Sequence, residues 1–458
     1  MPPVLLVLGA QNLANLRKLL SEAASVTRKL YIRFNPSHAK TDDIISSIYL
    51  QSSVCCPKVD VRILVKSQLP AEYRLIGEEM PDESVEETQR KYKKVVLGGT
   101  FDRMHNGHKV LLTKAAEIAS ENVVVGVTEK NMIEKKSLHE LIEPVTLRMS
   151  RVVDFVEDIS PSNLKCLAEP IIDPFGPSTR IADLEAIVVS RETIRGADAV
   201  NRRRVENGMN ELDVVVVELV EGADAILHET KLSSSSRRRD DLGELLKPVR
   251  HIATATTTSP KRPYVIGLCG GIASGKSHIG KYLAEKYGFE VIDCDKLAHT
   301  CYEPGSELIS KIAATFGLDT VVNGVVDRKR LGSIVFSDHV KLRQLSELMW
   351  PMVREKAEKM IEKSTAKVVV IEAAALIEAG WHNNLAEVWT VFVPQEETII
   401  RVMQRDKIDE EQARARISSQ ISNKERIDNS QIVFCSLWQY ETTREQVDKA
   451  VKGLLARI

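Results

Sequence analysis

Two glycine-rich turns, at residues 98–107 and 270–275, constrain the fold of this chain more than any other feature. Each follows an apolar, β-branched run and leads into a stretch of helical periodicity, after which a second short apolar run begins. Strands and helices alternating at this spacing predict a parallel sheet covered by helices, whose ligands bind beyond the carboxyl ends of the strands. Both glycine turns fall at that position. The predicted fold class is therefore α/β, with two tandem parallel-sheet nucleotide-binding domains.

Length and composition exclude several classes of protein. The 458 residues allow roughly three domains of about 150 residues each. An apolar content of 43% excludes a mostly disordered chain, and 63 basic against 64 acidic side chains exclude a general nucleic-acid binder. No apolar run approaches the roughly 18 residues needed to cross a bilayer. We expect a soluble protein with small-molecule partners and no transmembrane segment, and the sequence leaves protein partners open.

Cysteine usage indicates the compartment. The seven cysteines are odd in number and lack the CxxC spacing of metal and redox sites, which favours a reducing environment. The first residues show neither the pattern of a secretory signal nor that of a transit peptide. A cytoplasmic location is expected, with mitochondrial association left open.

Compositional breaks divide the chain into segments. Residues 1–90 predict a small N-terminal α/β segment of unknown role, ending in an acidic stretch. Its expected strands lie at residues 4–9 and 59–65, and its expected helices at 13–24 and 42–50. A stretch rich in Thr, Ser and Pro predicts a linker at 248–263. The two nucleotide-binding domains then occupy residues 93–247 and 264–458.

The second turn fits the phosphate-loop pattern GxxxxGK[ST] and lies between a predicted strand and a predicted helix, as the motif requires. Backbone N–H groups of such a turn and the positive end of the helix bind phosphate oxygens. Lys276 would reach the β- and γ-phosphates of ATP, and the Ser277 hydroxyl would ligate Mg²⁺. The other candidate phosphate-binding residues of this loop are Gly270, Gly271, Ala273, Ser274 and Gly275.

Carboxylates and arginines further along the chain could complete this site. Asp293 and Asp295 follow a predicted strand, where a carboxylate could accept the proton of an attacking hydroxyl. Capping of the next helix is the alternative for both. Arg401 and Arg405 lie in a polar, helix-prone stretch. On a mobile lid they would neutralise charge on the transferred phosphoryl group, whereas a solvated amphipathic helix is the alternative.

These motifs resemble the dephospho-coenzyme A kinase family over about residues 264–458. The similar segments are the phosphate loop, Val291–Asp295, Asp327-Arg328, Val335–Asp338, Arg401–Asp406 and Ile427–Asn429. The resemblance implies that Asp295 is the base for the ribose 3′-hydroxyl and that Asn429 lies on the adenine side. The chain departs from many bacterial members at Trp350-Pro351, where they have His-Pro, and at Ala374-Ala375-Leu376, where they have Pro-Leu-Leu.

The first turn reads Gly98-Gly99-Thr100-Phe-Asp and continues to His105 and His108. Two histidines three residues apart at a helix N-terminus can bind the α-phosphate of a nucleotide, and the Thr100 hydroxyl can bind the attacking phosphate. In-line attack on the α-phosphorus needs this positioning and charge stabilisation, and no covalent nucleophile. The histidine pair alone would be a weak signal. Together with the preceding turn it strongly indicates nucleotidyl transfer.

A serine run before residue 237 is a second phosphate-binding candidate of this domain. Ser233, Ser234 and Ser235 would present hydroxyl and N–H groups at the start of a helix to the β- and γ-phosphates. A serine run beside arginines is otherwise typical of a flexible linker. The upstream histidine pair favours the phosphate site.

Residues 94–247 resemble the phosphopantetheine adenylyltransferase branch of the nucleotidyltransferases, and residues 189–196 resemble its eukaryotic form. The resemblance implies a phosphate contact for Arg195. It also implies a lysine that binds the phosphate of phosphopantetheine. The candidates for that lysine are Lys130, Lys135 and Lys136.

An adenylyltransferase of this branch followed by a dephospho-coenzyme A kinase is the arrangement of the eukaryotic bifunctional coenzyme A synthase family. The resemblance implies the last two steps of coenzyme A biosynthesis. In the first, 4′-phosphopantetheine and ATP give dephospho-coenzyme A and diphosphate. In the second, another ATP phosphorylates the ribose 3′-hydroxyl, and both steps need Mg²⁺.

Three alternatives explain fewer of the motifs. A fused nicotinamide mononucleotide adenylyltransferase and ribosylnicotinamide kinase shares both turns, but the Ser190–Thr193 segment and the Ile292–Asp295 segment favour the coenzyme A assignment. An aminoacyl-tRNA synthetase would carry no phosphate-loop kinase. A nucleotide-binding scaffold without catalysis would not need Lys276, Asp295 and His108.

Overall fold

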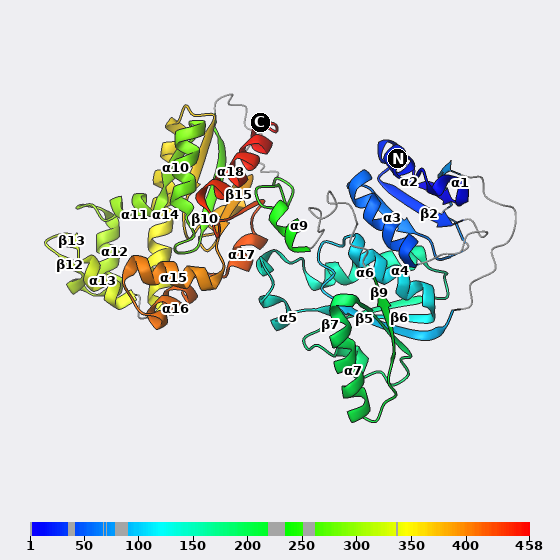
Figure 1. Cartoon of the computed structure of the whole chain (residues 1–458). Helices are drawn as coiled ribbons and strands as arrows, with labels where there is room; N and C mark the ends of the chain where they lie inside the picture. The colour runs from blue at the N-terminus through cyan, green and yellow to red at the C-terminus, as the bar shows by residue number, and fades with distance from the viewer. Residues whose placement is uncertain are drawn as a thin grey trace. The chain divides into compact units, whose positions relative to one another are not determined.

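The computed structural model describes residues 2–34, 42–66, 68–69, 71–77, 90–218, 234–250, 262–335 and 338–458. The chain divides into two compact units, Met1–Arg238 and Arg239–Ile458. Three parallel sheets of four or five strands dominate these units (Figure 1), and the predicted α/β fold class is confirmed. In the part of the chain that the structure describes, no helix has the length and apolar character needed to cross a membrane.

The N-terminal segment is a four-stranded parallel sheet in the order β3-β2-β1-β4. Its strands are β1 (Val4–Leu8), β2 (Lys29–Phe34), β3 (Asp60–Ile63) and β4 (Arg74–Gly77), and its helices are α1 (Ala10–Leu13), α2 (Leu16–Val26) and α3 (Asp42–Cys55). The sequence predicts β1, β3 and the two longer helices. It misses β2 and β4, because their uninterrupted apolar runs, Leu30–Ile32 and Leu75–Ile76, are only three and two residues long.

The second sheet has five parallel strands in the order β7-β6-β5-β8-β9. Its strands are β5 (Tyr92–Gly99), β6 (Ala119–Thr128), β7 (Lys165–Ile171), β8 (Ala186–Ser190) and β9 (Asp213–Val217). Its helices are α4 (Asn106–Ile118), α5 (Asn131–Glu134), α6 (Val145–Ile159), α7 (Ile194–Glu206) and α9 (Ser234–Asp240), with 3₁₀ turns at His139–Leu141, Gly176–Thr179 and Arg191–Thr193. The strand order reverses between β5 and β8, which is where ligands of such sheets bind.

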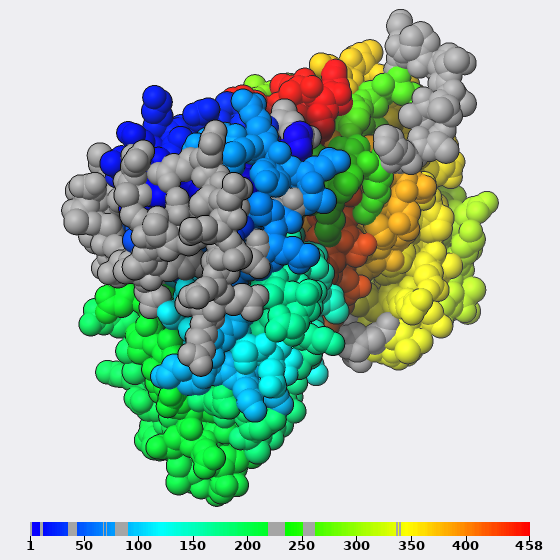
Figure 2. All heavy atoms as spheres, turned by 90° about the vertical axis from the view of Figure 1, so that its right-hand side faces the viewer, coloured from blue at the N-terminus to red at the C-terminus, as the bar shows by residue number. Residues whose placement is uncertain are grey.

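The N-terminal segment and the second sheet share one hydrophobic core. Tyr49 of α3 and Val61 of β3 pack in the same cluster as Val110 of α4 and Phe155 of α6. Figure 2 shows the light-blue atoms of the α3 region lying directly against cyan and teal atoms of the second sheet's helices. The polar contacts agree, because Asn106 Nδ2 donates to the Tyr49 carbonyl at 2.7 Å. The N-terminal segment is thus packed against the helix that carries the two histidines.

The third sheet also has five parallel strands, in the order β11-β14-β10-β15-β16. Its strands are β10 (Tyr264–Gly270), β11 (Glu290–Asp293), β14 (Val368–Glu372), β15 (Glu387–Phe392) and β16 (Ile432–Cys435). Its helices are α10 (Lys276–Tyr287), α11 (Cys294–Thr300), α12 (Glu307–Phe316), α13 (Arg328–Val335), α14 (His339–Lys363), α15 (Gln395–Asp406), α16 (Glu410–Ser418), α17 (Asn423–Asp428) and α18 (Tyr440–Leu455). A hairpin of β12 (Val321–Val322) and β13 (Val325–Val326) and 3₁₀ turns at Leu318–Thr320 and Trp381–Asn384 complete the unit.

Side chains of β10 pack in two different hydrophobic cores, one on each face of the sheet. Ile266 and Leu268 pack in the cluster that contains residues of α10 and α18. Cys269 packs in the cluster that contains residues of α11 to α14. Because successive side chains of a strand point to opposite faces, both faces of the sheet are covered by helices. The carboxyl end of β10 is left to the phosphate loop.

Residues 243–250 form part of the second unit. The Gly243 N–H donates to the Val433 carbonyl at 3.0 Å, and the Leu246 N–H donates to the Gln431 carbonyl at 2.8 Å. These bonds cover the edge of the sheet at β16. Gly243 has a φ of +80°, and a Cβ placed there would lie 2.2 Å from the Gln446 carbonyl oxygen. Both observations require glycine at this position.

We therefore expect Gly243→Ala to destabilise the second unit by about 2 to 4 kcal/mol, combining left-handed backbone strain with overlap in a packed site. All four tryptophans, Trp350, Trp381, Trp389 and Trp438, lie in this unit, so tryptophan fluorescence during urea unfolding of the whole chain reports on it.

Gly288→Ala is the matched control for this prediction. Gly288 ends α10 with a φ of +66°, and a Cβ there would meet no atom within 4 Å. It should cost only the strain of about 1 kcal/mol. Equal unfolding midpoints for the two variants would contradict the packing described for Gly243.

Candidate active sites

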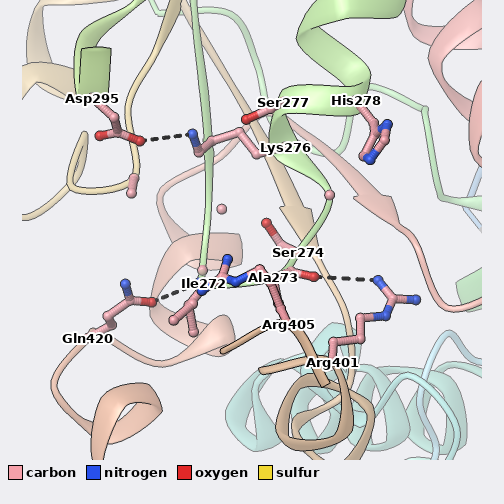
Figure 3. Close-up of a pocket in the computed structure, with 14 residues that line it drawn as sticks. Ile272, Ala273, Ser274, Lys276, Ser277, His278, Asp295, Arg401, Arg405 and Gln420 are labelled. Atoms are coloured by element: carbon pink, nitrogen blue, oxygen red, sulfur yellow. Dashed lines mark hydrogen bonds and ion pairs between the residues drawn. The ribbon is translucent and has the colours of Figure 1, made fainter. Parts of the chain in front are cut away.

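A pocket of about 560 Å³ lies at the carboxyl ends of the strands of the third sheet (Figure 3). Its lining residues are Gly270, Gly271, Ile272, Ala273, Ser274, Gly275, Lys276, Ser277, His278, Asp295, Ala374, Arg401, Arg405 and Gln420. The structure thus brings together every kinase-site residue that the sequence singles out except Asp293 and Asn429. One of the positions departing from the bacterial pattern, Ala374, also lines this pocket.

Backbone geometry explains the composition of the phosphate loop. Gly275 has a φ of +86° and immediately precedes α10, so the loop turns through the left-handed region just before the helix begins. The Ser274 hydroxyl is buried and makes no hydrogen bond with any described residue. A buried polar atom without a partner is costly, so this loop is built to meet a polar ligand.

Lys276 lies between two carboxylates. Its Nζ donates to Glu372 Oε1 at 2.8 Å and to Asp295 Oδ2 at 3.1 Å. Ser277 Oγ donates to the same Glu372 oxygen at 2.7 Å. Glu372 ends β14 and is only 3% exposed, whereas the Asp295 side chain is 56% exposed. The buried carboxylate holds the loop side chains, and Asp295 faces the pocket.

The charges around Lys276 keep it protonated. Burial by itself would lower the pKa of Lys276, but the negative charges of Asp295 and Glu372 outweigh burial and raise the pKa above its ordinary value. The ammonium group is therefore available as a fixed positive charge for phosphate at all physiological pH values.

The two aspartates after β11 have different positions. Asp293 is the N-cap of α11, and its Oδ1 accepts from the Lys296 N–H at 2.9 Å. The capping interpretation therefore applies to Asp293. Asp295 is two residues further on, in the first turn of α11, and reaches the pocket instead.

Arg401 and Arg405 of α15 both line the pocket. Arg401 Nη2 donates to the Ser436 carbonyl at 2.7 Å, and Ser436 Oγ donates to the Ser274 carbonyl at 2.7 Å. Figure 3 shows Gln420 beside Ile272, Arg401 beside Ala273 and Asp295 beside Lys276. Gln420 Oε1 accepts from the Ile272 N–H at 2.9 Å. These side chains support the loop from the α15–α16 side.

Asn429 lies outside this pocket. It ends α17, where its Nδ2 donates to the Glu425 carbonyl at 2.9 Å and its own carbonyl accepts from Arg250 at 2.8 Å. Trp350, the other departure from the bacterial pattern, is half-buried against the core of α11 to α14. Neither Asn429 nor Trp350 lines the pocket at the phosphate loop.

The histidine pair occupies the start of α4, beyond the end of β5. The His105 and His108 rings are stacked with centroids 3.8 Å apart, and the His105 N–H approaches His108 Nδ1 at 3.4 Å. Phe101 packs on His108 with ring centroids 5.2 Å apart. His105 Nδ1 is buried and has no partner among the described residues. Both rings are therefore fixed, and each retains hydrogen-bonding capacity for a ligand.

Burial favours the neutral form of both histidines. Desolvation, followed by the charge of Arg237, lowers the pKa of His105 to about 4. The pKa of His108 is lowered well below its ordinary value, first by burial and then by electrostatic interaction with His105, Arg237 and Lys136. Since His108 Nδ1 faces a backbone N–H, its proton resides on Nε2, where it can be donated.

A buried ion pair joins the first turn to the serine run. Asp102 is 0% exposed and pairs with Arg238, which is 1% exposed. Arg238 Nη2 donates to Ser235 Oγ at 3.1 Å, and Ser234 Oγ donates to the Asp102 carbonyl at 2.9 Å. The start of α9 is thereby held beside the turn that precedes the histidines. Ser233 lies outside the described residues.

Arg148 holds the backbone beneath Thr100. It is 1% exposed and donates to the Thr100 carbonyl at 2.7 Å, the Thr128 carbonyl at 2.9 Å and the Glu143 carbonyl at 2.8 Å. Thr128 Oγ1 also donates to Thr100 Oγ1 at 3.0 Å. These bonds fix the ends of β5 and β6, so the Thr100 hydroxyl is positioned rather than mobile.

The other residues that the sequence predicts for this site lie on several different elements. Gly98 and Gly99 end β5, and Arg195 is exposed in the first turn of α7, which follows β8. Lys136 is the one of the three candidate lysines whose charge acts on His108. Desolvation, and then the charge of Arg238, lowers the pKa of Lys136.

Comparison with known proteins identifies both domains. The family described as Dephospho-CoA kinase matches residues 264–436, and the family described as Cytidylyltransferase-like matches residues 96–240. A dephospho-CoA kinase of Carboxydothermus hydrogenoformans is 36% identical over 187 residues, which are 40% of this chain and 90% of that protein. A phosphopantetheine adenylyltransferase of Pyrococcus furiosus is 41% identical over 162 residues, which are 35% of this chain and 97% of that protein. The chain belongs to both enzyme families.

The chain is thus a fusion of a phosphopantetheine adenylyltransferase domain and a dephospho-CoA kinase domain, the enzymes of the last two steps of coenzyme A biosynthesis. A phosphopantetheine adenylyltransferase of Saccharomyces cerevisiae is also similar, with 37% identity over 175 residues, 38% of this chain and 54% of that protein. The function and the enzyme class predicted from the sequence are confirmed.

Four residues of these two sites were not predicted from the sequence. In the kinase domain, Glu372 is signalled by a lone carboxylate at the end of an otherwise apolar strand. In the adenylyltransferase domain, Asp102 and Arg238 lie inside motifs, but only the fold shows that they pair. Arg148 resembles any polar residue of an amphipathic helix, and no sequence signal distinguishes it.

Proposed function

We propose that this chain is a bifunctional coenzyme A synthase of the eukaryotic type, which converts 4′-phosphopantetheine and two ATP molecules into coenzyme A. The observation that carries the proposal is the presence of two complete phosphate-binding constellations on one chain, each at the carboxyl end of a parallel sheet. The seven cysteines are free thiols, which supports a reducing, cytoplasmic location.

In the first step, the Thr100 hydroxyl positions the phosphate of 4′-phosphopantetheine for in-line attack on the α-phosphorus of ATP. Neutral His108 donates from Nε2 to the developing charge on the α-phosphate, beside His105 and the N-terminus of α4. The hydroxyls of Ser234 and Ser235 at the start of α9 bind the β- and γ-phosphates, which depart as diphosphate.

Of the three candidate lysines, we propose Lys136 as the one that binds the phosphate of 4′-phosphopantetheine. Its positive charge acts on His108 and is itself affected by Arg238, which places it near both phosphate-binding motifs of this domain. Arg195, in the first turn of the helix that follows β8, is also proposed to contact phosphate.

In the second step, Asp295 accepts the proton of the ribose 3′-hydroxyl as this oxygen attacks the γ-phosphorus of ATP. Lys276 carries a fixed positive charge to the β- and γ-phosphates. The backbone of residues 270–275 binds phosphate oxygens, and Arg401 and Arg405 stabilise the transferred phosphoryl group from α15. Asn429 is retained as a proposed adenine-side residue.

The residues at the phosphate loop fit Mg²⁺. Ser277 Oγ and the Glu372 carboxylate are adjacent oxygen donors, which is the ligand type that Mg²⁺ prefers, and it takes one or two protein ligands together with substrate phosphates. When bound there, Mg²⁺ neutralises charge on the β- and γ-phosphates. Ser277 is the proposed ligand, and Glu372 orients it.

The domain boundaries remain a proposal: 1–90 for the N-terminal segment, 93–247 for the adenylyltransferase, 248–263 for the linker and 264–458 for the kinase. The backbone bonds of residues 243–250 to the edge of the kinase sheet favour ending the adenylyltransferase domain at α9.

A paired substrate assay tests the proposal. With ATP and Mg²⁺, the purified chain should convert 4′-phosphopantetheine to dephospho-CoA and then to CoA, and it should not adenylate nicotinamide mononucleotide. Chelation of Mg²⁺ should stop both steps. Turnover of nicotinamide mononucleotide without turnover of 4′-phosphopantetheine would show that the chain is the alternative fused enzyme. Absence of turnover with either substrate would indicate a scaffold.

A further inference from the structure

A second cavity lies between the N-terminal segment and the adenylyltransferase domain. It measures about 530 Å³, a volume within the range of small-molecule sites. The N-terminal segment contributes Ser52, Ser53, Cys56, Pro57, Lys58, Val59, Asp60 and Arg62, and the adenylyltransferase domain contributes Arg103, Met104, Asn106, Lys109, Arg151, Asp154 and Arg237. Neither part alone would form this cavity.

The lining of this cavity is strongly basic. Six of its side chains are cationic, namely Lys58, Arg62, Arg103, Lys109, Arg151 and Arg237, and two are carboxylates, Asp60 and Asp154. This contrasts with the chain as a whole, in which acidic and basic residues balance. A concave surface of one charge sign raises the local concentration of ligands of the opposite sign.

The cations differ in how far they are neutralised. Lys109 is 7% exposed and, with Arg62, pairs with Asp60. Arg151 pairs with Glu143 but keeps 42% of its side chain exposed. Lys58 has no ion-pair partner among the described residues, and it is exposed. The ion pairs of Asp60 therefore form part of the cavity wall. Lys58 of the N-terminal segment and Arg151 of the adenylyltransferase domain are more exposed, and their positive charges can bind a ligand.

Neutral side chains hold the two sides of this cavity together. The hydroxyls of Ser52 and Ser53 both accept from Asn106 Nδ2, at 2.9 and 2.7 Å, and both donate to the Tyr49 carbonyl, at 2.8 and 3.0 Å, which holds α3 against the start of α4. The donors left for phosphate oxygens are the cationic side chains, whose hydrogen bonds to phosphate are charge-assisted. Pro57, Val59 and Met104 add a small apolar surface. We propose that this cavity binds a phosphate-bearing small molecule, and that forming it is the function of the N-terminal segment.

The position of the cavity links it to adenylyl transfer. Met104 and Asn106 flank His105, and Arg237 lies between Arg238 and the serines at the start of α9. The Arg237 guanidinium also donates to the Met104 carbonyl at 3.4 Å. A bound phosphate would therefore contact the same two segments that hold the histidines and the serine run. Its occupancy affects the first step and leaves the kinase step unchanged.

Titration calorimetry with sodium tripolyphosphate and the whole chain tests the cavity. Lys58→Glu and Arg151→Gln should each weaken one class of tripolyphosphate sites about tenfold, because each removes a charge-assisted contact. Lys18→Glu, on the exposed side of α2, makes the same charge change as Lys58→Glu away from the cavity and should bind like the unaltered chain. Binding by the two cavity variants that equals that of Lys18→Glu would overturn the proposal.

Kinetics of the same variants distinguish the source of the phosphate. An increase of about tenfold in the KM for ATP in the first step would show that the cavity receives the phosphates of ATP itself. An unchanged KM together with weakened tripolyphosphate binding would show that the cavity binds a separate phosphate ester. The rates of both steps in Lys18→Glu report on the proposed function independently of the cavity.

Discussion

Lys276→Ala should lower the rate of dephospho-CoA phosphorylation by about a hundredfold to a thousandfold, while the adenylyl-transfer rate stays unchanged. The magnitude is that of removing one preorganised charge from a transition state in a partly buried site. Lys276 is the cation held at the phosphate loop by Glu372 and Asp295, and the negative charges of those carboxylates outweigh the effect of burial and keep it charged. Separate assays with 4′-phosphopantetheine and with dephospho-CoA measure the two steps.

Two further variants separate catalysis from folding. Removing Lys276 leaves the buried Glu372 carboxylate without its cation, which can cost about 3 to 5 kcal/mol of stability. The double variant Lys276→Ala, Glu372→Gln removes that cost. It should remain inactive in the kinase step, and its tryptophan fluorescence should be that of a folded kinase unit. Lys281→Ala, an exposed lysine of the same helix, should keep full activity. Kinase activity in the double variant would refute the role of Lys276.

His108→Ala should have the opposite pattern, with the first step reduced about a hundredfold to a thousandfold and the second step unchanged. His108 is neutral, stacked on His105 and supported by Phe101, so it acts as a fixed donor to the α-phosphate. His108→Asn keeps a neutral donor and should retain more activity than the alanine variant. Equal loss in both steps would refute the assignment of two separate sites.

The pH profile of the first step provides an independent measurement. A lowered pKa means that a histidine stays neutral as the pH falls through its ordinary value of about 6.5. The pKa of His105 is lowered to about 4 and that of His108 also lies well below its ordinary value. Hence kcat/KM for adenylyl transfer should show no histidine titration between about pH 6 and 8. A step near pH 6.5 that disappears in His108→Ala would contradict the buried, neutral state.

Much of this enzyme could be predicted because its chemistry depends on local sequence. A phosphate loop needs a glycine with left-handed backbone and a helix start within a few residues, and residues 270–277 contain both. The histidine pair likewise lies within one turn of α4. Short-range geometry of this kind is determined by neighbouring residues, so the two nucleotide sites and their order were evident from the sequence alone.

Only the tertiary structure decided which distant residues meet these motifs. Glu372 reaches Lys276 because β14 lies beside β10, although the two residues are 96 positions apart in the chain. Arg238 reaches Asp102 across 136 positions, and this pair holds the serine run beside the first turn.

Strand order and helix packing also decided what the N-terminal segment contacts, although its own sequence carries no catalytic motif. Its packing against α4 creates a basic cavity next to the histidines. The sequence by itself thus determined the two chemistries and their order along the chain, because each depends on a few consecutive residues. The buried charge pairs and the composite cavity were decided by the fold, because contacts between distant segments exist only once the strands are paired and the helices packed.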